Sequence, residues 1–559
     1  MSTGDRISRV YDNFRGVDFR GEEINLVRSP DSLNVWKDYR KTDSIRTRPG
    51  MALAVEFPAK VYGIFFYKNL KLVHSGKNLY TVTSGGKKTI IRSDLNEAVS
   101  QSFIYEGIWY FKDGKNYFQY DGSEIKEIEG YIPTTSIGRK PNGGGTIHED
   151  VNMLTGIRKN TFLADGGSFD FVLDALNIDV DYPPIVKVND KVVTDGYSVN
   201  YTQGKITFTK APDAPLTDGQ DNVSIQFRKT VEKYRDSILK CTLLQVFDNR
   251  VFFSGNPDYP SVVWHCSLND PTYVSDLDYY REGMDSSQIR GLVAGNNALW
   301  VFREPSEANT NVFYHTPSID DNYGKIYPSS HSSITIGCTG KAINFNDDII
   351  FFSDRGMEGI SGDVTTEQAA AHRSSMVDRK LISESGYANM ILEEWDGYLL
   401  VIIGDKVYLA DSRSMFANGN HQEYEWFYWS MEHPITSASV HDGVLWLGTE
   451  TGIYTLTDNE CDIESWWVTP KDKFQNPNKL KTTNKRGCVA EATGDISVYA
   501  KLEDTDFELI GTYENVEDYF VSRIKRKKWK DIQLKFYSQT RFSIETVTLE
   551  AWVGGYIKR

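Results

Sequence analysis

Short apolar runs separated by pairs of turn-forming residues recur along most of the chain. In Ile104–Gly122, IYEGIWYFKDGKNYFQYDG, aromatic runs are divided by Glu-Gly and Asp-Gly pairs. Aromatic side chains suit a pleated, half-buried surface, and Asp-Gly pairs are typical of tight hairpin turns. The stretch therefore predicts a strand–turn–strand unit. Further stretches with this pattern begin at Val246, Ala294, Asn344, Glu394 and Ser439.

The spacing of these hairpins is regular. Their turns lie at Asn249, Asn297, Asp347, Gly397 and Gly443. Successive turns are about 48, 50, 50 and 46 residues apart, close to the period of a four-stranded propeller blade. A fainter copy of the unit begins at Val61. A single blade cannot bury both of its faces, so the unit must repeat. We therefore expect an all-β chain built on a β-propeller of six or seven blades.

One interval is too long for a single blade. Gly107 and Asn249 are about 142 residues apart, against roughly 50 for a blade. The excess follows the glycine-rich segment RKPNGGG, Arg139–Gly145, and contains alternating stretches such as PIVKVND and KITFTK. Alternation with period two predicts half-buried strands, so a β-sandwich inserted between blades is expected. Longer alternating runs after Cys461 predict a second, C-terminal β-sandwich, and helix is expected only within Thr365–Ser385.

These patterns give a domain plan. It consists of an N-terminal arm that could supply a propeller-closing strand (1–58), the first blades (59–145), the inserted β-sandwich (146–230), the remaining blades (231–460) and the C-terminal β-sandwich (461–559). With 559 residues the chain exceeds the size of one compact core, in agreement with several domains.

The net charge of −15 argues against a protein that grips duplex DNA, because such proteins present basic surfaces. An acidic surface would instead let DNA pass without sticking. No stretch approaches the roughly 18 apolar residues of a membrane helix, and the N-terminus lacks the apolar core of a signal peptide. We expect synthesis in the cytoplasm and no membrane insertion. The five cysteines are scattered, which predicts neither a zinc site nor a disulfide framework.

Motifs of catalysis are missing from the sequence. The chain has no phosphate-binding loop, no His-Glu-x-x-His and no Gly-x-Ser-x-Gly. The acidic pairs Asp347-Asp348 and Glu393-Glu394 are interpreted as residues of blade turns. We therefore predict no catalytic residue, no metal and no cofactor.

One segment is distinguished by its charge. RIKRKKWK places six cations in eight residues and leaves −21 on the rest of the chain, since the total is −15. It is expected to be a strand that docks on an acidic surface, such as the propeller of a neighbouring copy. The alternative is a solvated strand or loop. The candidate binding residues are Arg523, Lys525, Arg526, Lys527, Lys528 and Lys530.

The order of the pieces resembles a known family. An arm ending in SIRTRPGM (Ser44–Met51) is followed by a propeller and by a C-terminal sandwich with the basic stretch VSRIKRKKWKDIQLKFYS. This order is similar to that of the packaged-DNA stabilisation proteins, or tail nozzles, of short-tailed bacteriophages. Further resembling stretches are Arg28–Tyr39, Asp248–Pro271 and Ser333–Gly362. The inserted sandwich lies outside the resemblance and looks like tail-fibre or capsid-decoration modules.

The resemblance implies a non-enzymatic structural protein of the virion, located in the phage tail. In the family, six copies form a homo-oligomeric ring below the adaptor that hangs from the portal. The ring extends the DNA channel and holds the genome until ejection, and genomic DNA passes through the lumen without tight binding. Tail-fibre or tail-tip proteins are further expected partners. Two alternatives stay open: a receptor- or carbohydrate-binding tail protein, and a propeller glycosidase whose paired carboxylates act on host surface polymer.

Overall fold

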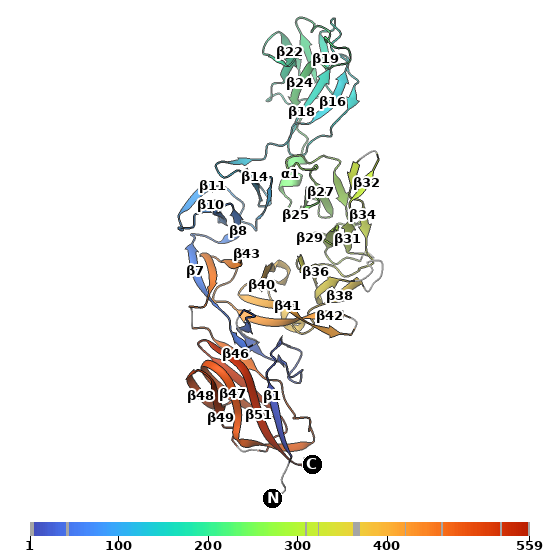
Figure 1. Cartoon of the computed structure of the whole chain (residues 1–559). Coiled ribbons are helices and arrows are strands. Elements are labelled where there is room, and N and C mark those ends of the chain that lie inside the picture. Colours follow the sequence, from blue (N-terminus) through green and yellow to red (C-terminus); the bar gives the residue numbers. More distant parts are fainter. Residues whose placement is uncertain are drawn as a thin grey trace. The chain divides into compact units, whose positions relative to one another are not determined.

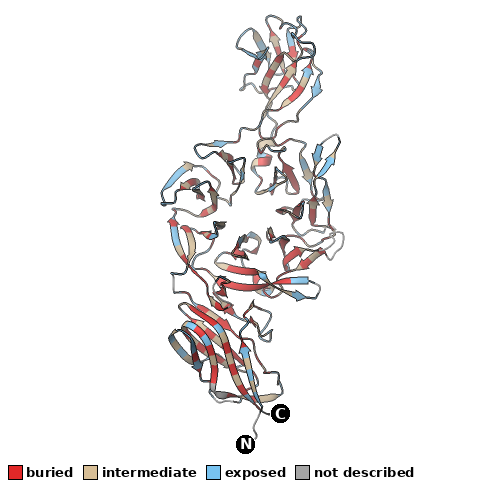
Figure 2. Ribbon diagram, in the orientation of Figure 1, coloured by how far each residue is buried: buried red, intermediate tan, exposed pale blue. Residues whose placement is uncertain are grey.

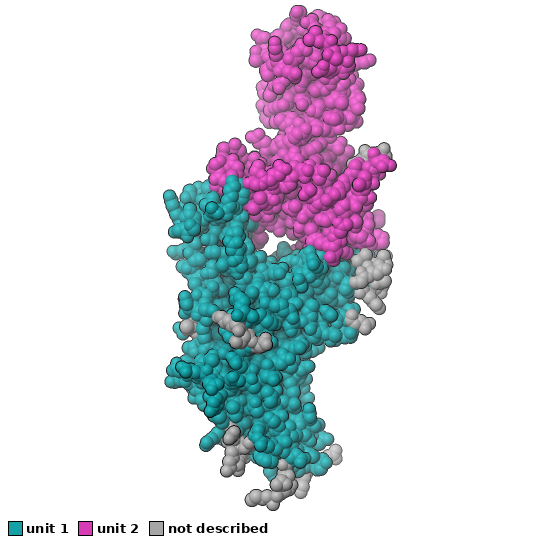
Figure 3. All heavy atoms as spheres, viewed as in Figure 1, with its two compact units in different colours: residues 1–93, 309–312, 332–559 teal, residues 94–308, 313–331 magenta. Residues whose placement is uncertain are grey.

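The computed structural model describes residues 5–40, 44–307, 310–321, 324–361, 369–419, 421–459, 462–525 and 528–556, with 484–486 described by their backbone only. Its regular structure is almost entirely β (Figure 1). The chain divides into two compact units (Figure 3). Unit 1 comprises Met1–Ser93, Asn309–Val312 and Ser332–Arg559, and unit 2 comprises Asp94–Ala308 and Phe313–His331.

Seven antiparallel sheets of four strands each occur in the described chain, which confirms the predicted β-propeller and gives it seven blades. Unit 1 holds β8 (Val61–Tyr67), β9 (Leu70–Ser75), β10 (Asn78–Val82) and β11 (Lys88–Arg92); β35 (Ala342–Phe345), β36 (Asp348–Ser353), β37 (Gly356–Ile360) and β38 (Ala370–His372); β39 (Ile391–Trp395), β40 (Tyr398–Ile403), β41 (Lys406–Asn418) and β42 (His421–Ser430); and β43 (Ser437–His441), β44 (Val444–Gly448), β45 (Gly452–Thr457) and β7 (Gly50–Glu56). Unit 2 holds β12 (Gln101–Tyr105), β13 (Ile108–Lys112), β14 (Tyr117–Tyr120) and β15 (Ile125–Glu127); β25 (Leu243–Phe247), β26 (Arg250–Ser254), β27 (Val262–His265) and β28 (Tyr279–Arg281); and β29 (Ile289–Gly295), β30 (Ala298–Arg303), β31 (Val312–His315) and β34 (Ser329–His331), with a side hairpin of β32 (Ser318–Asp320) and β33 (Gly324–Ile326).

The turn pairs seen in the sequence join the first two strands of six of these sheets. Both residues of each pair have positive φ, as a two-residue type I′ hairpin requires, and Asn, Asp and Gly tolerate this conformation best. The pairs are Glu106-Gly107, Asp248-Asn249, Asn296-Asn297, Asn346-Asp347, Asp396-Gly397 and Asp442-Gly443.

The second strand of several blades is almost entirely buried. All six residues of β30 and of β40 are buried, as are five of the six residues of β36. A strand covered on both faces needs apolar side chains at successive positions, and the runs ALWVF in β30 and YLLVII in β40 supply them. Figure 2 shows buried residues concentrated within the sheets.

The strand that completes the last blade comes from the other end of the sequence. Strand β7 pairs antiparallel with β45, in register from Gly452 opposite Glu56 to Thr457 opposite Gly50. Val55 of β7 is buried in one apolar cluster with Ile453 of β45. The N-terminal segment therefore closes the propeller.

The C-terminal sandwich also depends on N-terminal strands. One ten-stranded sheet contains β46 (Ser465–Val468), β47 (Lys479–Leu502), β48 (Glu508–Val516), β49 (Tyr519–Ser522), β50 (Ile532–Ser538) and β51 (Phe542–Tyr556) together with β1 (Arg6–Tyr11), β4 (Ser32–Leu33), β5 (Val35–Lys37) and β6 (Ile45–Thr47). Strand β47 pairs with β49 before Gly494 and with β50 after it, and pairs with β48 from Gly494 onward. Gly494 has φ 96°, and a Cβ there would lie 2.1 Å from the carbonyl oxygen of Arg541. The domain plan, which confined this sandwich to 461–559, is therefore incomplete, because pairing between distant strands leaves no local signal.

Buried polar contacts fasten the N-terminal arm between the blade of β42 and the sandwich. Besides its long strands the arm contains the parallel pair β2 (Gly16–Val17) and β3 (Arg28–Ser29). The Arg28 guanidinium donates two hydrogen bonds of 2.8 and 2.7 Å to buried Glu425 of β42. Asn34 donates to the carbonyl of Glu464, and its side-chain oxygen accepts from the amide of Ser430 at 2.7 Å. These contacts satisfy groups that would otherwise be buried without partners.

The inserted sandwich begins earlier than the sequence predicts. It contains β16 (Thr134–Arg139), β17 (Thr146–Ile147), β18 (Ile157–Phe162), β19 (Asp170–Val172), β20 (Ile185–Val188), β21 (Lys191–Val193), β22 (Tyr197–Asn200), β23 (Lys205–Phe208) and β24 (Val223–Arg228). The start at 146 is therefore wrong: Gly143–Gly145 lies in the turn between β16 and β17, inside the insert. Between β17 and β18 the chain returns to a blade, where the Met153 amide donates to the Val274 carbonyl.

Helix is scarcer than expected in 365–385. Residues 362–368 lie outside the described chain; beyond them are β38, the four-residue α2 (Asp378–Leu381) and a 3-10 turn at Tyr387–Asn389. A second short helix, α1 (Tyr234–Leu239), precedes β25. It lies between the last strand of the insert, β24, and the first strand of the next blade, β25.

Two substitutions in β7 test the closure of the propeller. Val55 is 9% exposed and Leu53 is 54% exposed. We expect Val55→Asp to lower the midpoint of thermal unfolding by several degrees, because burying an unpaired carboxylate costs roughly 2 kcal/mol or more. Leu53→Asp is the matched control and should leave the midpoint almost unchanged. Equal losses in the two variants would contradict this role of β7.

Candidate functional site

The basic segment connects β49 to β50 at the end of the C-terminal sandwich. Its described residues form a loop, so the strand prediction is wrong. Two apolar side chains interrupt the charges and are buried: Ile524 is 6% exposed and Trp529 is 0% exposed. Between them, Lys525 and Lys528 are exposed, and Arg526 and Lys527 lie outside the described residues. The letters I and W within RIKRKKWK are the signal that could have predicted an anchored loop.

Trp529 fixes the end of the loop to strand β47. Its backbone amide donates to the carbonyl of Lys481 at 3.0 Å and its carbonyl accepts from the Lys481 amide at 2.8 Å. The indole nitrogen donates to Thr483, and the ring meets Phe474 edge-to-face at 5.5 Å. Lys481 is itself buried, which lowers the pKa of its ammonium, and donates to the carbonyls of Lys473 and Asn476. The loop therefore has a rigid base.

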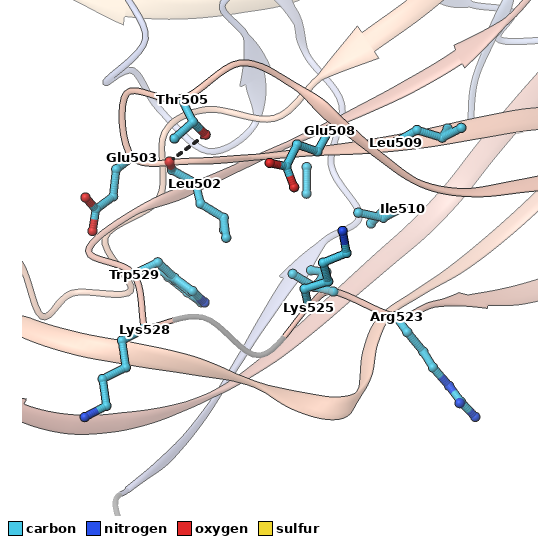
Figure 4. A pocket seen from close by; sticks show the side chains of 12 residues that line it. Leu502, Glu503, Thr505, Glu508, Leu509, Ile510, Arg523, Lys525, Lys528 and Trp529 are labelled. Carbon is cyan, nitrogen blue, oxygen red and sulfur yellow. Dashed lines mark hydrogen bonds between the residues drawn. The ribbon is translucent and has the colours of Figure 1, made fainter.

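A hollow of about 250 Å³ lies between this loop and strand β48 (Figure 4). We call it the basic hollow. Its apolar lining consists of Ala500, Leu502, Leu509, Ile510, Ile524 and Trp529, and Glu503, Thr505, Glu508, Arg523, Lys525 and Lys528 complete it. In Figure 4, Lys525 extends toward the strand that carries Ile510, whereas Arg523 and Lys528 point away from the hollow. Four of the six apolar residues belong to β47 and β48, and their position beside the loop has no local signal in the sequence.

The cations of the basic hollow differ from neighbouring lysines in their partners. Over the described chain, the side chains of Arg523, Lys525 and Lys528 form no hydrogen bond or ion pair, and neither does that of Lys530, which follows the hollow in sequence. By contrast, Lys501 lies 2.8 Å from Glu22 and Lys471 lies 2.8 Å from Asp504. Lys471 and Lys501 are thus neutralised within the chain, whereas the cations of the loop have no ion pair among the described residues.

A second cluster of titratable groups lies beside β37 and β38. His372 Nδ1 is 3.1 Å from Glu358, and its Nε2 is 2.6 Å from Asp378. Burial alone would lower the pKa of His372, but hydrogen bonds to the two carboxylates raise it to about 10. Ser374 donates to the other oxygen of Asp378 at 2.5 Å. Both imidazole nitrogens are occupied by carboxylates, so His372 cannot take a proton from Ser374, and the cluster acts as a structural tie.

The two acidic pairs have different positions. Asp347 lies in a turn with φ 64°, as predicted, and Asp348 begins β36, where it pairs with Arg373 at 2.9 Å. Glu393 and Glu394 lie within strand β39, so the turn prediction is wrong for them. The turn of this blade is formed by Asp396 and Gly397, further along the chain. Burial raises the pKa of Glu393 to about 7.

Two further findings concern ligands and membranes. Among the residues described, no group of three or more His, Cys, Asp or Glu is placed to hold a metal ion. None of the helices in the described ranges is long and apolar enough to cross a membrane.

No protein-family model matches the chain, and no curated protein sequence matches it significantly. Solved structures with a similar fold include the computationally designed Ika8 protein, with 10% identity and a TM-score of 0.34, covering 73% of this chain and 99% of that one. BamB from Moraxella catarrhalis has 10% identity and a TM-score of 0.32, covering 73% and 98%. Streptogramin B lyase has 11% identity and a TM-score of 0.26, covering 73% and 97%. Such likeness carries no information about function.

The raised pKa of His372 predicts how its contribution to stability depends on pH. Its pKa is raised from 6.5 to about 10 in the folded chain, so its stabilising effect is complete below about pH 6.5 and is lost as the pH rises through 10. His372→Gln should therefore lower the thermal midpoint most near pH 6 and hardly at all above pH 10. His148→Gln, at an exposed position, is the control. A loss that is the same at every pH would exclude the imidazolium as its cause.

Proposed function

We propose that this chain is a structural subunit of a bacteriophage tail, a nozzle or stopper that forms a homo-oligomeric ring below the portal-adaptor. In this role it extends the DNA channel and retains packaged DNA until ejection, without enzymatic activity. The observation that carries the proposal is the basic hollow, whose rim cations have no partner in the described chain. They belong to the segment RIKRKKWK, whose six cations leave −21 on the rest of the chain.

The charge distribution supports assembly with an acidic partner. Four unpaired cations close together repel one another, and an acidic surface would relieve that repulsion. Each exposed pair contributes only about 0–1 kcal/mol, but several in one network can decide whether two surfaces dock. Since the remainder of the chain is acidic, a neighbouring copy and the adaptor are the partners that we infer.

The architecture supports a mechanical role. The propeller is closed by an N-terminal strand, and the same arm is buried between a blade and the C-terminal sandwich through Arg28 and Asn34. A subunit built in this way resists local opening, because its terminal segment is part of two sheets. An acidic surplus would let phosphates slide past without binding. The order of arm, propeller and C-terminal sandwich with its basic stretch resembles that of phage tail nozzles, and this resemblance also supports the proposal.

The proposal is tested by reversing the charge of the hollow's rim. We expect a variant with Arg523→Glu, Lys525→Glu and Lys528→Glu to fold as a monomer but to enter phage tails at least about tenfold less efficiently, because like charges then face the partner. Incorporation is measured by quantifying the protein in purified particles. Assembly of the unmodified chain should also weaken with salt, since the Debye length falls to about 3 Å near 1 M.

A charge-matched control separates docking from net charge. Lys187, Lys191 and Lys210 are exposed in the inserted sandwich, and replacing all three with Glu makes the same change in net charge. This control should assemble normally. Normal incorporation and salt tolerance of the rim variant would show that the basic loop is only a solvated surface.

A further inference from the structure

A tight turn in unit 2 presents a leucine between two aspartates. Leu277 is 68% exposed, and Asp276 and Asp278 flank it. The Leu277 amide donates to the Ser275 hydroxyl at 3.1 Å, and the Tyr279 amide donates to the Leu277 carbonyl at 3.0 Å. These bonds hold the leucine at the tip of a fixed turn. We call residues 276–278 the acidic knuckle.

The carboxylates of the acidic knuckle form no ion pair with a Lys or Arg of the described chain. Asp276 accepts a hydrogen bond from Tyr234 at 3.0 Å, and Asp278 lies 3.9 Å from His265. Burial lowers the pKa of that histidine to about 4, so it is neutral at pH 7. No Lys or Arg in the described chain lies within 4.0 Å of either carboxylate. Burial raises the pKa of Asp278 to about 6. The charge of Arg250 lowers this pKa, and the charges of Asp150 and Asp276 raise it.

The acidic knuckle and the basic hollow have complementary properties. The hollow has an apolar floor that includes exposed Leu509, and its rim carries cations without partners. The knuckle has an exposed apolar tip with carboxylates on both sides. The hollow's three cations outnumber its two carboxylates, Glu503 and Glu508. A contact between hollow and knuckle would remove apolar surface from water and bring the knuckle's carboxylates to cations that have no ion pair.

We propose that the basic hollow of one copy receives the acidic knuckle of a second copy. Leu277 enters the hollow, and Asp276 and Asp278 face the cations of its rim. This inference rests on the proposed function and names the surface that the basic loop docks on.

The two surfaces differ, so the contact is heterologous. Every copy carries one hollow and one knuckle, and each copy can therefore join two neighbours head to tail. Contacts of this type close into a ring when the rotation between copies allows it and otherwise extend into a filament. A ring subunit requires this kind of interface.

The test uses two full-length variants and their mixture, measured by sedimentation velocity. The hollow variant carries Arg523→Glu, Lys525→Glu and Lys528→Glu, and the knuckle variant carries Leu277→Arg. Each alone should associate with itself at least about tenfold more weakly than the unmodified chain. Mixed in equal amounts they should form dimers, because one supplies an intact knuckle and the other an intact hollow.

The controls separate this pairing from the proposed function. Leu216→Arg changes a fully exposed leucine of the insert and should associate normally. Leu277→Asp is a second knuckle variant and should also weaken association. If the hollow variant fails to assemble while both knuckle variants associate normally, the pairing is wrong and the loop docks elsewhere. An unmodified chain that stays monomeric at all concentrations, or a mixture without dimers, also overturns the pairing. If no variant changes association or incorporation, the proposed function fails as well.

Discussion

Five of the seven strands in the first 56 residues complete two larger sheets, and unit 1 depends on this sharing. Strand β7 completes the blade of β43–β45, whereas β1, β4, β5 and β6 join the C-terminal sheet. The free edge of a sheet needs partners for its backbone groups, and here those partners lie several hundred residues away in the sequence. Pairing over such distances must offset a large loss of chain entropy. Neither the last blade nor the sandwich is therefore complete until the arm has docked.

This dependence explains where the buried polar contacts lie. Arg28 meets Glu425, and Asn34 meets Ser430 and Glu464, along the path of the arm between blade and sandwich. Removing one partner would leave a buried group unsatisfied, which costs about 1–3 kcal/mol. The sandwich that the arm helps to build also carries the basic hollow, with Trp529 fixing the loop at its base. The arm and the candidate docking surface therefore belong to the same sheet.

Local patterns allowed much of the fold to be predicted. The pairs such as Asp248-Asn249 combine turn chemistry with regular spacing, and both signals are short-range. Non-local features could not be read in the same way. The pairing of β1 with β51 has no local signature, and the glycines at 143–145 suggested a linker although they form a turn between two strands of the insert. The charge of the basic segment was evident in the sequence, but its form as an anchored loop depends on the burial of Trp529 against distant Lys481.

The account predicts an assembly, and an electron micrograph of the purified full-length protein tests it most directly. Two-dimensional averages of negatively stained particles, recorded at low ionic strength, report whether copies associate and with what symmetry. We expect closed rings with a central opening, which dissociate in high salt because charged surfaces hold the copies together. Particles that are single copies under all conditions, or paired copies related by a two-fold axis, would contradict the claim that this chain forms a head-to-tail ring.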